Sequence, residues 1–341
     1  MKTVVHLIYA DGYSGLESLA VQMIKNLPPS WKGIYAAPAG IGLKCAAVEG
    51  VEVVECNTHS VSAVKELLKE MSPDAVHAHD PHMSLICALC GYSFISHLHC
   101  NCPWMKKLCK NSLALAFSAI CAKKVVCVSQ SIVDEFIFSS LIKKKLTVLQ
   151  NVVDSRRITE MAGDTTDKKY DLCFVGRLTP LKQPEKLLEV VSLMKERREG
   201  VRAVVVGDGE CREDLERLSR EMSLSSNVTF VGFQSNPWQY MAESRIGVLT
   251  SKSEGFGLAA VEAMILGLPF LAFPVGGLCD IVCDENGKLL SNAADMADEA
   301  LRLLSDGEYY EKKSRSAKET VQRFTDMEAY MKNIVGIYNG L

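Results

Sequence analysis

No uninterrupted apolar run in this 341-residue sequence reaches the ~20 residues that a membrane-spanning helix requires, which argues against a helical integral membrane protein. A strong charge excess is also lacking, since 38 lysines and arginines stand against 41 aspartates and glutamates, for a formal net charge of −3. Nucleic-acid-binding proteins usually carry a strongly basic field, so that class is disfavoured. No N-terminal signal peptide is recognisable, because residues 3–9 have the pattern of a strand. We expect a cytoplasmic protein.

Two cofactor motifs are missing. Val206-Gly207-Asp208-Gly209 is only half of a dinucleotide fingerprint, and the full G-x-G-x-x-G does not occur there. We therefore interpret it as a tight turn between a strand and a helix. No Asp-x-Asp metal motif occurs in the segments expected to line the site, and we predict neither a cofactor nor a metal ion.

Thirteen cysteines are many for such a chain, but their number is odd and their spacing is irregular. Reduced thiols in a cytosolic core are favoured over disulfides. One group could suggest zinc: His97, His99, Cys100 and Cys102. These residues alternate along an expected strand end and loop, which is the interpretation that we prefer.

Short apolar runs alternate with helical patterns in both halves of the chain, and this alternation predicts parallel βαβ units in doubly wound α/β sheets. A polar, turn-rich segment separates the halves. We expect an N-terminal Rossmann-like domain over residues 1–155, a linker over 156–170 and a C-terminal Rossmann-like domain over 171–324. Ligands of such sheets bind beyond the carboxyl ends of the strands, so a central cleft between the two domains is the expected site.

The most informative stretch runs from Ser253 to Met264. Residues 258–266 are apolar except for Glu262, and Gly267 ends the run as at a helix C-terminus. A helix that is apolar all round is buried, and a buried carboxylate needs a partner. Glu262 must therefore meet either a protein donor, such as an arginine or backbone N–H groups, or a polar ligand. Gly255 and Gly257 would let the backbone of the helix N-terminus approach an anion.

Other candidates follow predicted strands. Arg177 and Lys182 share one strand-to-helix loop and suit a diphosphate, and residues 228–232 end a strand whose last residue, Gly232, could offer backbone groups to a base. Ser14-Gly15 opens a helix directly after the first strand, another N-terminus that can face a phosphate. His77 and His79 lie at a strand end, where we expect one to point inward and one outward.

The combination of these motifs resembles the retaining glycosyltransferases of family four (group 1), which have the GT-B fold. The resemblance covers nearly the whole chain, and Glu254 and Glu262 with seven residues between them form its most specific part. It is carried by the first-strand glycine loop, His77-Ala78-His79, Cys127-Val128-Ser129, Asn151-Val152-Val153-Asp154, Phe174-Val175-Gly176-Arg177, Val206-Gly207-Asp208-Gly209 and Ser253-Glu254-Gly255-Phe256-Gly257.

The resemblance implies a role for each candidate. Arg177 and Lys182 would hold the donor diphosphate, Glu254 would contact hydroxyls of the donor sugar, and Glu262 would accept the ribose hydroxyls. Backbone amides of Phe256, Gly257 and Leu258 would meet sugar and phosphate oxygens. From the other domain, Gly15 would approach the phosphates and His79 would lie near the transferred sugar. The last helix, about residues 325–341, would pack back on the N-terminal domain.

Two departures from the family pattern concern turns. The usual double glycine of the first loop is Ser14-Gly15 here, which weakens the expected phosphate contact, and the usual Asn-Gly is Asn151-Val152. In the absence of a metal motif, loop cations and helix dipoles must stabilise the leaving diphosphate. We expect metal-independent, front-face transfer with retention.

The function implied is transfer of a hexose or N-acetylhexosamine from a nucleotide-diphosphate sugar, with UDP as the commonest nucleotide, to a glycan or lipid-linked acceptor in surface or capsular polysaccharide synthesis. Two rivals stay open: a sugar-nucleotide 2-epimerase and a non-catalytic sugar-nucleotide-binding subunit. The longest apolar run, residues 112–122, is flanked by lysines. We prefer a core helix there, with peripheral contact at the inner membrane surface as the alternative.

Overall fold

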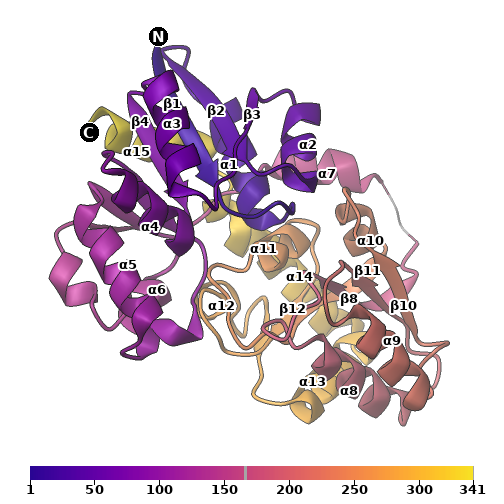
Figure 1. Ribbon diagram of the computed structural model, residues 1–341. Coiled ribbons are helices and arrows are strands. Elements are labelled where there is room, and N and C mark those ends of the chain that lie inside the picture. Colours follow the sequence, from indigo (N-terminus) through magenta and orange to yellow (C-terminus); the bar gives the residue numbers. More distant parts are fainter. Residues whose placement is uncertain (165–166, 341) are drawn as a thin grey trace. The chain divides into compact units, whose positions relative to one another are not determined.

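The computed structural model describes residues 1–164 and 167–340, which divide into two compact units (Figure 1). The N-terminal unit comprises Met1–Val152 together with Asp326–Leu341, and the C-terminal unit comprises Val153–Thr325.

The N-terminal unit is a doubly wound α/β structure. Its strands within the described residues are β1 (Lys2–Ile8), β2 (Trp31–Ala37), β3 (Val53–Glu55), β4 (Ala75–His79), β5 (Ile95–Leu98), β6 (Lys124–Cys127) and β7 (Leu146–Val148). Its helices there are α1 (Gly15–Lys25), α2 (Ile41–Val48), α3 (Val61–Met71), α4 (Pro81–Cys90), α5 (Lys110–Cys121), α6 (Gln130–Glu135) and α15 (Met327–Asn339), with 3-10 turns η1 (Pro103–Lys106) and η2 (Ser139–Ile142).

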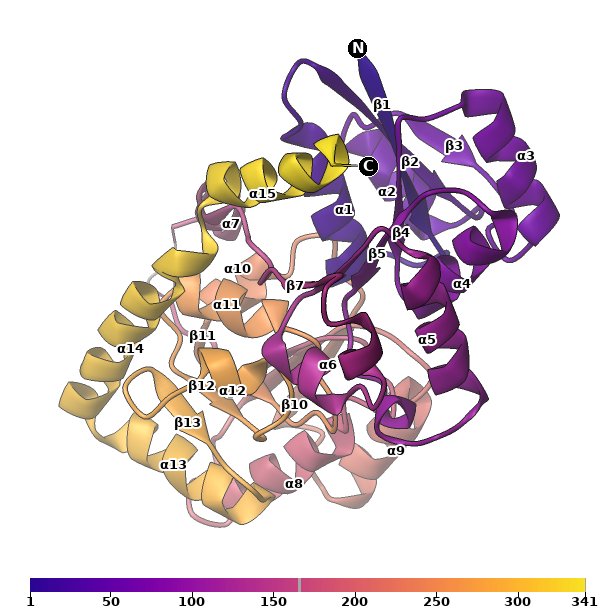
Figure 2. The ribbon, with the colours of Figure 1, turned by 90° about the vertical axis from the view of Figure 1, so that its left-hand side faces the viewer.

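The seven strands form one parallel sheet in the order β3-β2-β1-β4-β5-β6-β7. Strands are added on one side of β1 up to β3 and on its other side from β4 onward, so the strand order reverses between β1 and β4. Central strands are covered on both faces and are therefore almost entirely buried. On one face lie α1 and α15, while α3, α4 and α5 pack side by side on the other (Figure 2). The predicted doubly wound sheet is confirmed for this unit.

The last helix completes the N-terminal core although it is far from it in sequence. Tyr330, Met331, Ile334 and Tyr338 of α15 are buried and cluster with residues of α1 and of the central strands. Asp326 caps the helix by accepting a hydrogen bond from the backbone N–H of Ala329 (2.8 Å). The apolar spacing of three and four residues therefore places one face of α15 on the sheet.

The C-terminal unit repeats this architecture. Its strands within the described residues are β8 (Tyr170–Val175), β9 (Ala203–Val206), β10 (Val228–Gly232), β11 (Ser244–Leu249), β12 (Phe270–Ala272) and β13 (Gly287–Leu289). Its helices there are α7 (Ser155–Ala162), α8 (Pro184–Lys195), α9 (Arg212–Glu221), α10 (Trp238–Ala242), α11 (Leu258–Ile265), α12 (Leu278–Ile281), α13 (Ala293–Ser305) and α14 (Gly307–Val321), followed by η3 (Gln322–Phe324).

Its six strands are parallel in the order β10-β9-β8-β11-β12-β13. α8 packs against α9 and α13, while α11 packs against α7, α10 and α14. The short strand β13 is not recognised from the sequence, because three residues with one apolar side chain in a polar context carry too little pattern.

The segment between the halves differs from expectation. The sequence predicts an irregular linker over residues 156–170, but the structure has helix α7 at its start, and β8 begins at Tyr170. Asp154 caps α7 by accepting from the backbone N–H of Arg157 (3.0 Å), and Ile158 and Ala162 are buried. The sequence does not indicate this helix, because its composition is polar and only one narrow face is apolar. Residues 165 and 166 lie outside the described residues.

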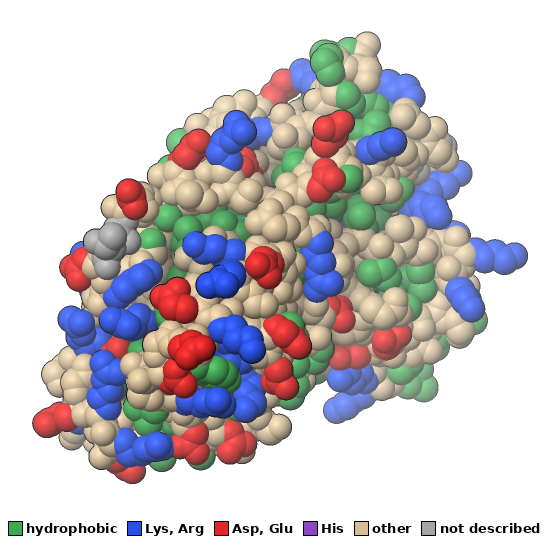
Figure 3. Space-filling view, turned by 180° about the vertical axis from the view of Figure 1, so that it is seen from behind, with side chains coloured by type: hydrophobic (Ala, Val, Ile, Leu, Met, Phe, Trp, Pro, Cys, Tyr) green, Lys and Arg blue, Asp and Glu red, His purple; other side chains and the backbone are tan. Residues whose placement is uncertain are grey.

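Charged side chains of both signs are interspersed on the face seen in Figure 3, in keeping with the nearly balanced charge. Within residues 1–164 and 167–340, no helix combines the length and apolar character needed to cross a membrane.

A truncation in α15 tests whether this helix carries the stability of the N-terminal unit. Ile334→Ala removes a fully buried side chain, and we expect the free energy of unfolding to fall by about 2–5 kcal/mol. Urea unfolding followed by the fluorescence of Trp31, which lies in the same core cluster, measures the loss. Lys332→Ala, an exposed position on the same helix, is the matched control and is expected to change little. Equal stability of both variants would contradict the packing.

Candidate active site

Loops that follow neighbouring strands meet at one edge of the C-terminal sheet, because parallel strands all point their carboxyl ends there. The loop after β11 is tied to the loop after β8: the backbone N–H of Lys252 donates to the carbonyl of Leu181 (2.8 Å), and Thr250 Oγ1 donates to the carbonyl of Gln183 (2.8 Å). Candidate residues that are about 70 positions apart in sequence are thereby brought together.

An ion pair lies at this junction. Lys182 Nζ donates to Glu254 Oε1 (2.5 Å), and the Ser251 hydroxyl donates to the same oxygen (2.7 Å). Glu254 is almost fully buried, whereas Lys182 keeps about a fifth of its side chain exposed. The sequence assigns Lys182 to the diphosphate and Glu254 to the donor sugar, and the structure holds the two groups in direct contact.

Two glycines allow the loops to come this close. A Cβ atom on Gly276 would lie 1.7 Å from the carbonyl oxygen of Glu254, and one on Gly207 would lie 1.9 Å from that of Gly176. Both residues also have positive φ, +53° and +141°. The role expected for the glycine turn after β9, a tight turn rather than a cofactor contact, fits this geometry.

The backbone ahead of Glu262 forms a helix N-terminus, as predicted. Gly257 is the N-cap of α11 with φ +101°, a conformation that favours glycine, and Leu258 is the first helical residue. Gly255 and Phe256 are buried, and the Phe256 ring packs edge-on against Phe324 at 5.2 Å. The first N–H groups of α11 lack partners in the helix and can serve an anion.

Helix α11 is not buried all round, contrary to the expectation. Ala260, Val261, Ala263 and Met264 face the core, while positions 258, 259, 262, 265 and 266 form a partly exposed stripe that contains Glu262. The sequence pattern could not indicate which face is exposed, because both faces carry apolar side chains and Glu262 is the one polar residue of the stripe. Glu262 therefore lies on the open side of the helix.

The surroundings of Glu262 explain its protonation behaviour. Shielding from water raises its pKa to about 7, although the indole N–H of Trp238 and the guanidinium of Arg157 favour the carboxylate. Arg157 lies over the Trp238 ring at 5.7 Å, and Trp238 Nε1 is buried without a regular hydrogen bond there.

Arg177 and Gly232 complete the candidates of this unit. Arg177 is exposed and makes no ion pair or side-chain hydrogen bond within the part of the chain that is described. Gly232 ends β10 with φ +74°, and its carbonyl accepts from the backbone N–H of Gly207 (2.8 Å). That carbonyl is thus occupied in holding the loop after β9.

In the N-terminal unit, Gly15 is the first residue of α1. Ser14 caps the helix, and both its backbone N–H (2.7 Å) and its hydroxyl (2.6 Å) donate to the carboxylate of Glu17. The buried Glu17 is therefore part of a capping box. Its negative charge at the helix start competes with an anion, so the structure adds a second reason, besides the missing glycine, to expect a weak phosphate contact.

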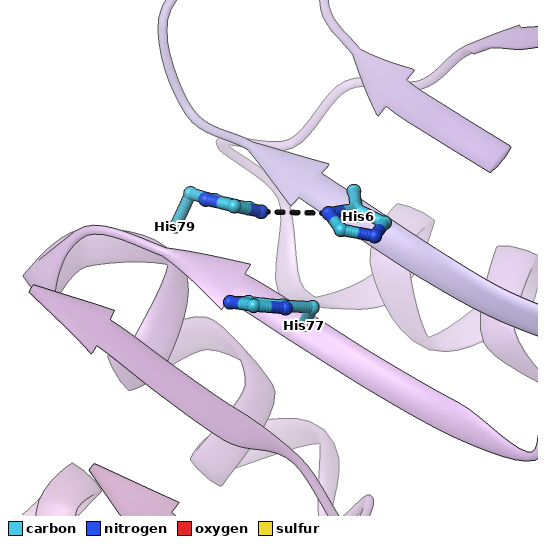
Figure 4. A group of neighbouring side chains, drawn as sticks. All are labelled: His6, His77 and His79. Carbon is cyan, nitrogen blue, oxygen red and sulfur yellow. Dashed lines mark hydrogen bonds between the residues drawn. The ribbon is translucent and has the colours of Figure 1, made fainter. Parts of the chain in front are cut away.

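The expectation for the two histidines of β4 is wrong. His77 and His79 point to the same face of the sheet with their rings stacked at 4.3 Å, because side chains two positions apart on a strand share a face (Figure 4). His6 projects beside them from β1, and its Nδ1 is hydrogen-bonded to Nε2 of His79 (2.9 Å). His79 is completely buried and cannot touch a ligand without a local rearrangement.

Burial keeps this group of histidines neutral. It lowers the pKa of His6 and of His99 to about 3 and holds the pKa values of His77, His79 and His97 well below the ordinary value, with neighbouring imidazoles adding to the effect for the last three. Burial has the opposite effect on the nearby acid Asp80, whose pKa rises to about 7.

Sequence reasoning missed several residues of these sites. Trp238 and Arg157 reach Glu262 from α10 and α7, and Ser251 holds Glu254. His6 and Tyr338 join the histidine group from opposite ends of the chain. Only Ser251 could have been found from its position two residues before Ser253; the others come together through tertiary packing alone.

Comparison with known proteins gives two matching family models. Residues 157–320 match the model described as glycosyl transferases group 1, and residues 55–157 match the model described as glycosyltransferase family 4. The two matches adjoin and together cover residues 55–320, which include parts of both units.

Among curated relatives, the poly(ribitol-phosphate) alpha-N-acetylglucosaminyltransferase of Staphylococcus aureus strain COL is 27% identical over 169 residues, which are 48% of this chain and 34% of that protein. The D-inositol 3-phosphate glycosyltransferase of Mycolicibacterium smegmatis is 38% identical over 144 residues, 40% of this chain and 32% of that protein. The chain thus matches only about a third of the length of these relatives.

A crystal structure of Anabaena HepE in complex with UDP and glucose resembles this chain with a TM-score of 0.88 at 18% identity, covering 100% of both chains. Together with the two parallel sheets described above, this likeness confirms the GT-B fold that the sequence predicts.

The free energies of unfolding of the two units are expected to change with pH in opposite directions. The unfolded chain binds a proton at His6 below about pH 6.5 while the folded chain does not, so the N-terminal unit loses stability as the pH falls, by about 2 kcal/mol from His6 alone at about pH 5. Asp80 opposes this, but the buried histidines outnumber it. The C-terminal unit has no histidine. Just below pH 7 its Glu262 binds a proton in the folded chain but not in the unfolded chain, so that unit gains stability as the pH falls from about 7.

Urea unfolding at about pH 7.5 and at about pH 5 measures both effects. Trp238→Phe leaves Trp31 and Trp104 to report on the N-terminal unit, and the double variant Trp31→Phe/Trp104→Phe leaves Trp238 to report on the other. Shifts of the same sign for both reporters would contradict the assignment.

Proposed function

Because the chain belongs to the group 1 glycosyltransferases of family four, we propose that it transfers a hexose or N-acetylhexosamine from a nucleotide-diphosphate sugar to a glycan or lipid-linked acceptor. UDP is the proposed nucleotide, with retention of the anomeric configuration and without a metal ion. The relative named for N-acetylglucosamine transfer to poly(ribitol-phosphate) and the HepE complex with UDP and glucose support the donor class. Surface polysaccharide synthesis in the cytoplasm is the proposed setting.

The observation that carries the proposal is the ion pair of Lys182 and Glu254 at the sheet edge that also carries the exposed Arg177 and the N-terminus of α11. Two cations and a set of backbone N–H groups at one sheet edge suit the two charges of a diphosphate. The carboxylate of Glu254 lies in the same group and would repel an anion, but it can accept hydrogen bonds from sugar hydroxyls. The edge therefore fits a phosphate linked to a sugar.

Glu262 supplies the recognition of the nucleoside in this proposal. It lies on the partly exposed stripe of α11, and shielding from water raises its pKa. Ribose hydroxyls would donate to the carboxylate and offset the loss of hydration. Donor binding is then favoured by the ionised form of Glu262.

Transfer proceeds on one face of the donor sugar. The acceptor hydroxyl oxygen forms a bond to the anomeric carbon as the bond from that carbon to the diphosphate breaks, and the electron pair stays on the phosphate oxygen. The acceptor proton passes to the leaving phosphate. Arg177 and Lys182 offset the negative charge that grows on the diphosphate, which is the largest contribution expected of these side chains. Gly15 and His79 keep their expected roles as predictions.

Removal of either cation tests the diphosphate assignment. We expect Arg177→Ala and Lys182→Ala each to lower turnover by roughly 10²–10³, the usual cost of losing one charge-stabilising donor. The assay measures release of UDP from UDP-glucose, UDP-galactose and UDP-N-acetylglucosamine together with mass spectrometry of the acceptor. Lys252→Ala, an exposed lysine on the neighbouring loop, is the matched control and should retain activity.

Melting curves of the variants separate catalysis from folding, because loss of Lys182 removes the ion-pair partner of the buried Glu254. Arg177 is exposed, and its variant should melt like the parent. Full activity of both alanine variants would refute the diphosphate assignment. Interconversion of free UDP-sugars without an acceptor-linked product would instead identify an epimerase, and binding of UDP-sugars without turnover of any acceptor a non-catalytic subunit.

We propose, further, that the N-terminal unit contacts an anionic membrane through α5. Leu113, Phe117 and Ile120 lie three and four positions apart on this helix, and each is 47–53% exposed. Residues 106–145 contain eight lysines and only two acids, in a chain whose net charge is negative. An apolar stripe within a basic segment is the pattern of an interfacial helix on anionic lipid.

Sedimentation with vesicles tests the membrane contact. We expect binding to vesicles that contain phosphatidylglycerol, weaker binding at high salt because exposed charges are screened, and loss of binding in Leu113→Glu/Phe117→Glu. Val48→Glu changes an exposed apolar residue of the same unit outside the basic segment and should bind like the parent. Equal sedimentation of both variants with these vesicles would exclude the surface.

A further inference from the structure

A continuous chain of hydrogen bonds runs through the core of the N-terminal unit. Its five links are His97 Nδ1 to His77 Nε2 (3.0 Å), His77 Nδ1 to the Tyr338 hydroxyl (2.7 Å), that hydroxyl to His6 Nε2 (3.4 Å), His6 Nδ1 to His79 Nε2 (2.9 Å) and His79 Nδ1 to His99 Nε2 (3.0 Å). We call these six residues the histidine chain. Figure 4 shows its middle part, in which the rings of β1 and β4 face one another.

Both ends of the histidine chain are unsatisfied. Nε2 of His97 and Nδ1 of His99 are buried and have no hydrogen-bond partner within the described residues, whereas every nitrogen of His6, His77 and His79 has one. Buried polar atoms in native proteins are nearly always paired with protein, water or an ion. The two open positions therefore call for a partner of their own.

The hydrogens of the histidine chain can be counted. Five neutral imidazoles and one phenol carry six N–H or O–H hydrogens, but the chain has five hydrogen bonds. The surplus hydrogen lies either at one end of the chain, with a lone pair at the other end, or on the Tyr338 oxygen, which can accept from both neighbouring imidazoles. A cation favours the second arrangement: the nitrogens that face the ion offer lone pairs, the inner nitrogens donate toward Tyr338, and the surplus hydrogen on that oxygen turns away from the chain or is released.

The geometry points to a metal. One ring nitrogen from each of His79, His97 and His99 lies within 4.8 Å of those of the other two. We propose that these three imidazoles bind a transition-metal cation of the zinc type, with His77, His6 and Tyr338 orienting them. Binding requires Nδ1 of His79 to exchange its hydrogen bond with Nε2 of His99 for the ion, while its Nε2 stays bonded to His6. Neutral imidazole nitrogens suit zinc, copper and nickel, and the absence of a carboxylate from this group of described ligands disfavours magnesium and calcium.

The inner hydrogen bonds have the form that metal sites require. A metal-bound histidine usually donates its other N–H to a fixed acceptor, which sets its tautomer and ring orientation. His97 has such a partner in His77, and His79 has one in His6. His99 is also only partly buried, which gives an ion access from the surface. Coordination at the ~2.0–2.1 Å of a Zn–N bond requires the three rings to draw together.

The ligand set differs from the one that the sequence suggests. His97 and His99 are common to both, but Cys100 and Cys102 lie outside the group, with their sulfur atoms 3.5 Å from each other. His79 from the neighbouring strand takes their place, since the β4–β5 register pairs His79 with His97. The site lies in the N-terminal unit, and His79 is the one residue that it shares with the proposed transfer, which uses no metal.

Metal binding to the chelator-treated full chain tests the proposal. We expect Zn²⁺ to bind with one ion per chain, to raise the melting temperature and to release protons, as measured by calorimetry in two buffers and by elemental analysis. His99→Ala should abolish binding, and it is preferred because this residue is partly exposed. Tyr338→Phe should weaken binding by roughly 10–100-fold, the usual effect of losing an orienting partner.

The double variant His59→Ala/His82→Ala is the matched control, since both histidines are outside the chain and exposed. It should bind like the parent. The absorption spectrum of bound Co²⁺ separates the two ligand sets: nitrogen ligation supports the proposal, and a thiolate charge-transfer band that disappears in Cys100→Ser/Cys102→Ser overturns it. Failure of Zn²⁺ to bind the chelator-treated parent would also overturn it, and neither outcome bears on UDP release, which tests the transferase separately.

Discussion

The ion pair between Lys182 and Glu254 is the interaction on which the C-terminal edge depends. A carboxylate that is 7% exposed must be paired, because an isolated buried charge is very costly. The pairing holds the loop after β11 against the loop after β8, and hydrogen bonds from the backbone N–H of Lys252 and the hydroxyl of Thr250 fix that contact. Gly276 makes room for it, since any side chain there would collide with the Glu254 carbonyl. The diphosphate and sugar positions become neighbours as a consequence of one buried charge.

The N-terminal unit handles buried polarity in a different way. It places five imidazoles in its core and keeps them uncharged, so no ion pair is needed. Their nitrogens are paired with one another and with Tyr338 of the last helix, which connects the two ends of the chain in sequence. Such a network is favourable only when every member is satisfied, and its two open ends are therefore the informative positions.

The central helix shows how far pattern reasoning extends. A run of apolar residues with one acid correctly indicates a helix that starts near Gly257 and ends before Gly267. It does not indicate which face is covered, because apolar residues occupy both the buried side and the partly exposed stripe. Apolar composition equals burial only where a neighbouring element packs, and α7, α10 and α14 leave one side of α11 open.

The sequence by itself determined the alternation of strands and helices, the doubly wound class and the loops that carry Arg177, Lys182 and Glu254, because period, glycine position and strand ends are local properties. Only the tertiary structure decided that Lys182 contacts Glu254, that Trp238 and Arg157 surround Glu262, and that His6 and Tyr338 complete the histidine chain. These contacts join residues up to 332 positions apart. Strand register and packing between elements create these contacts. The local sequence pattern around either residue of a contact does not indicate them.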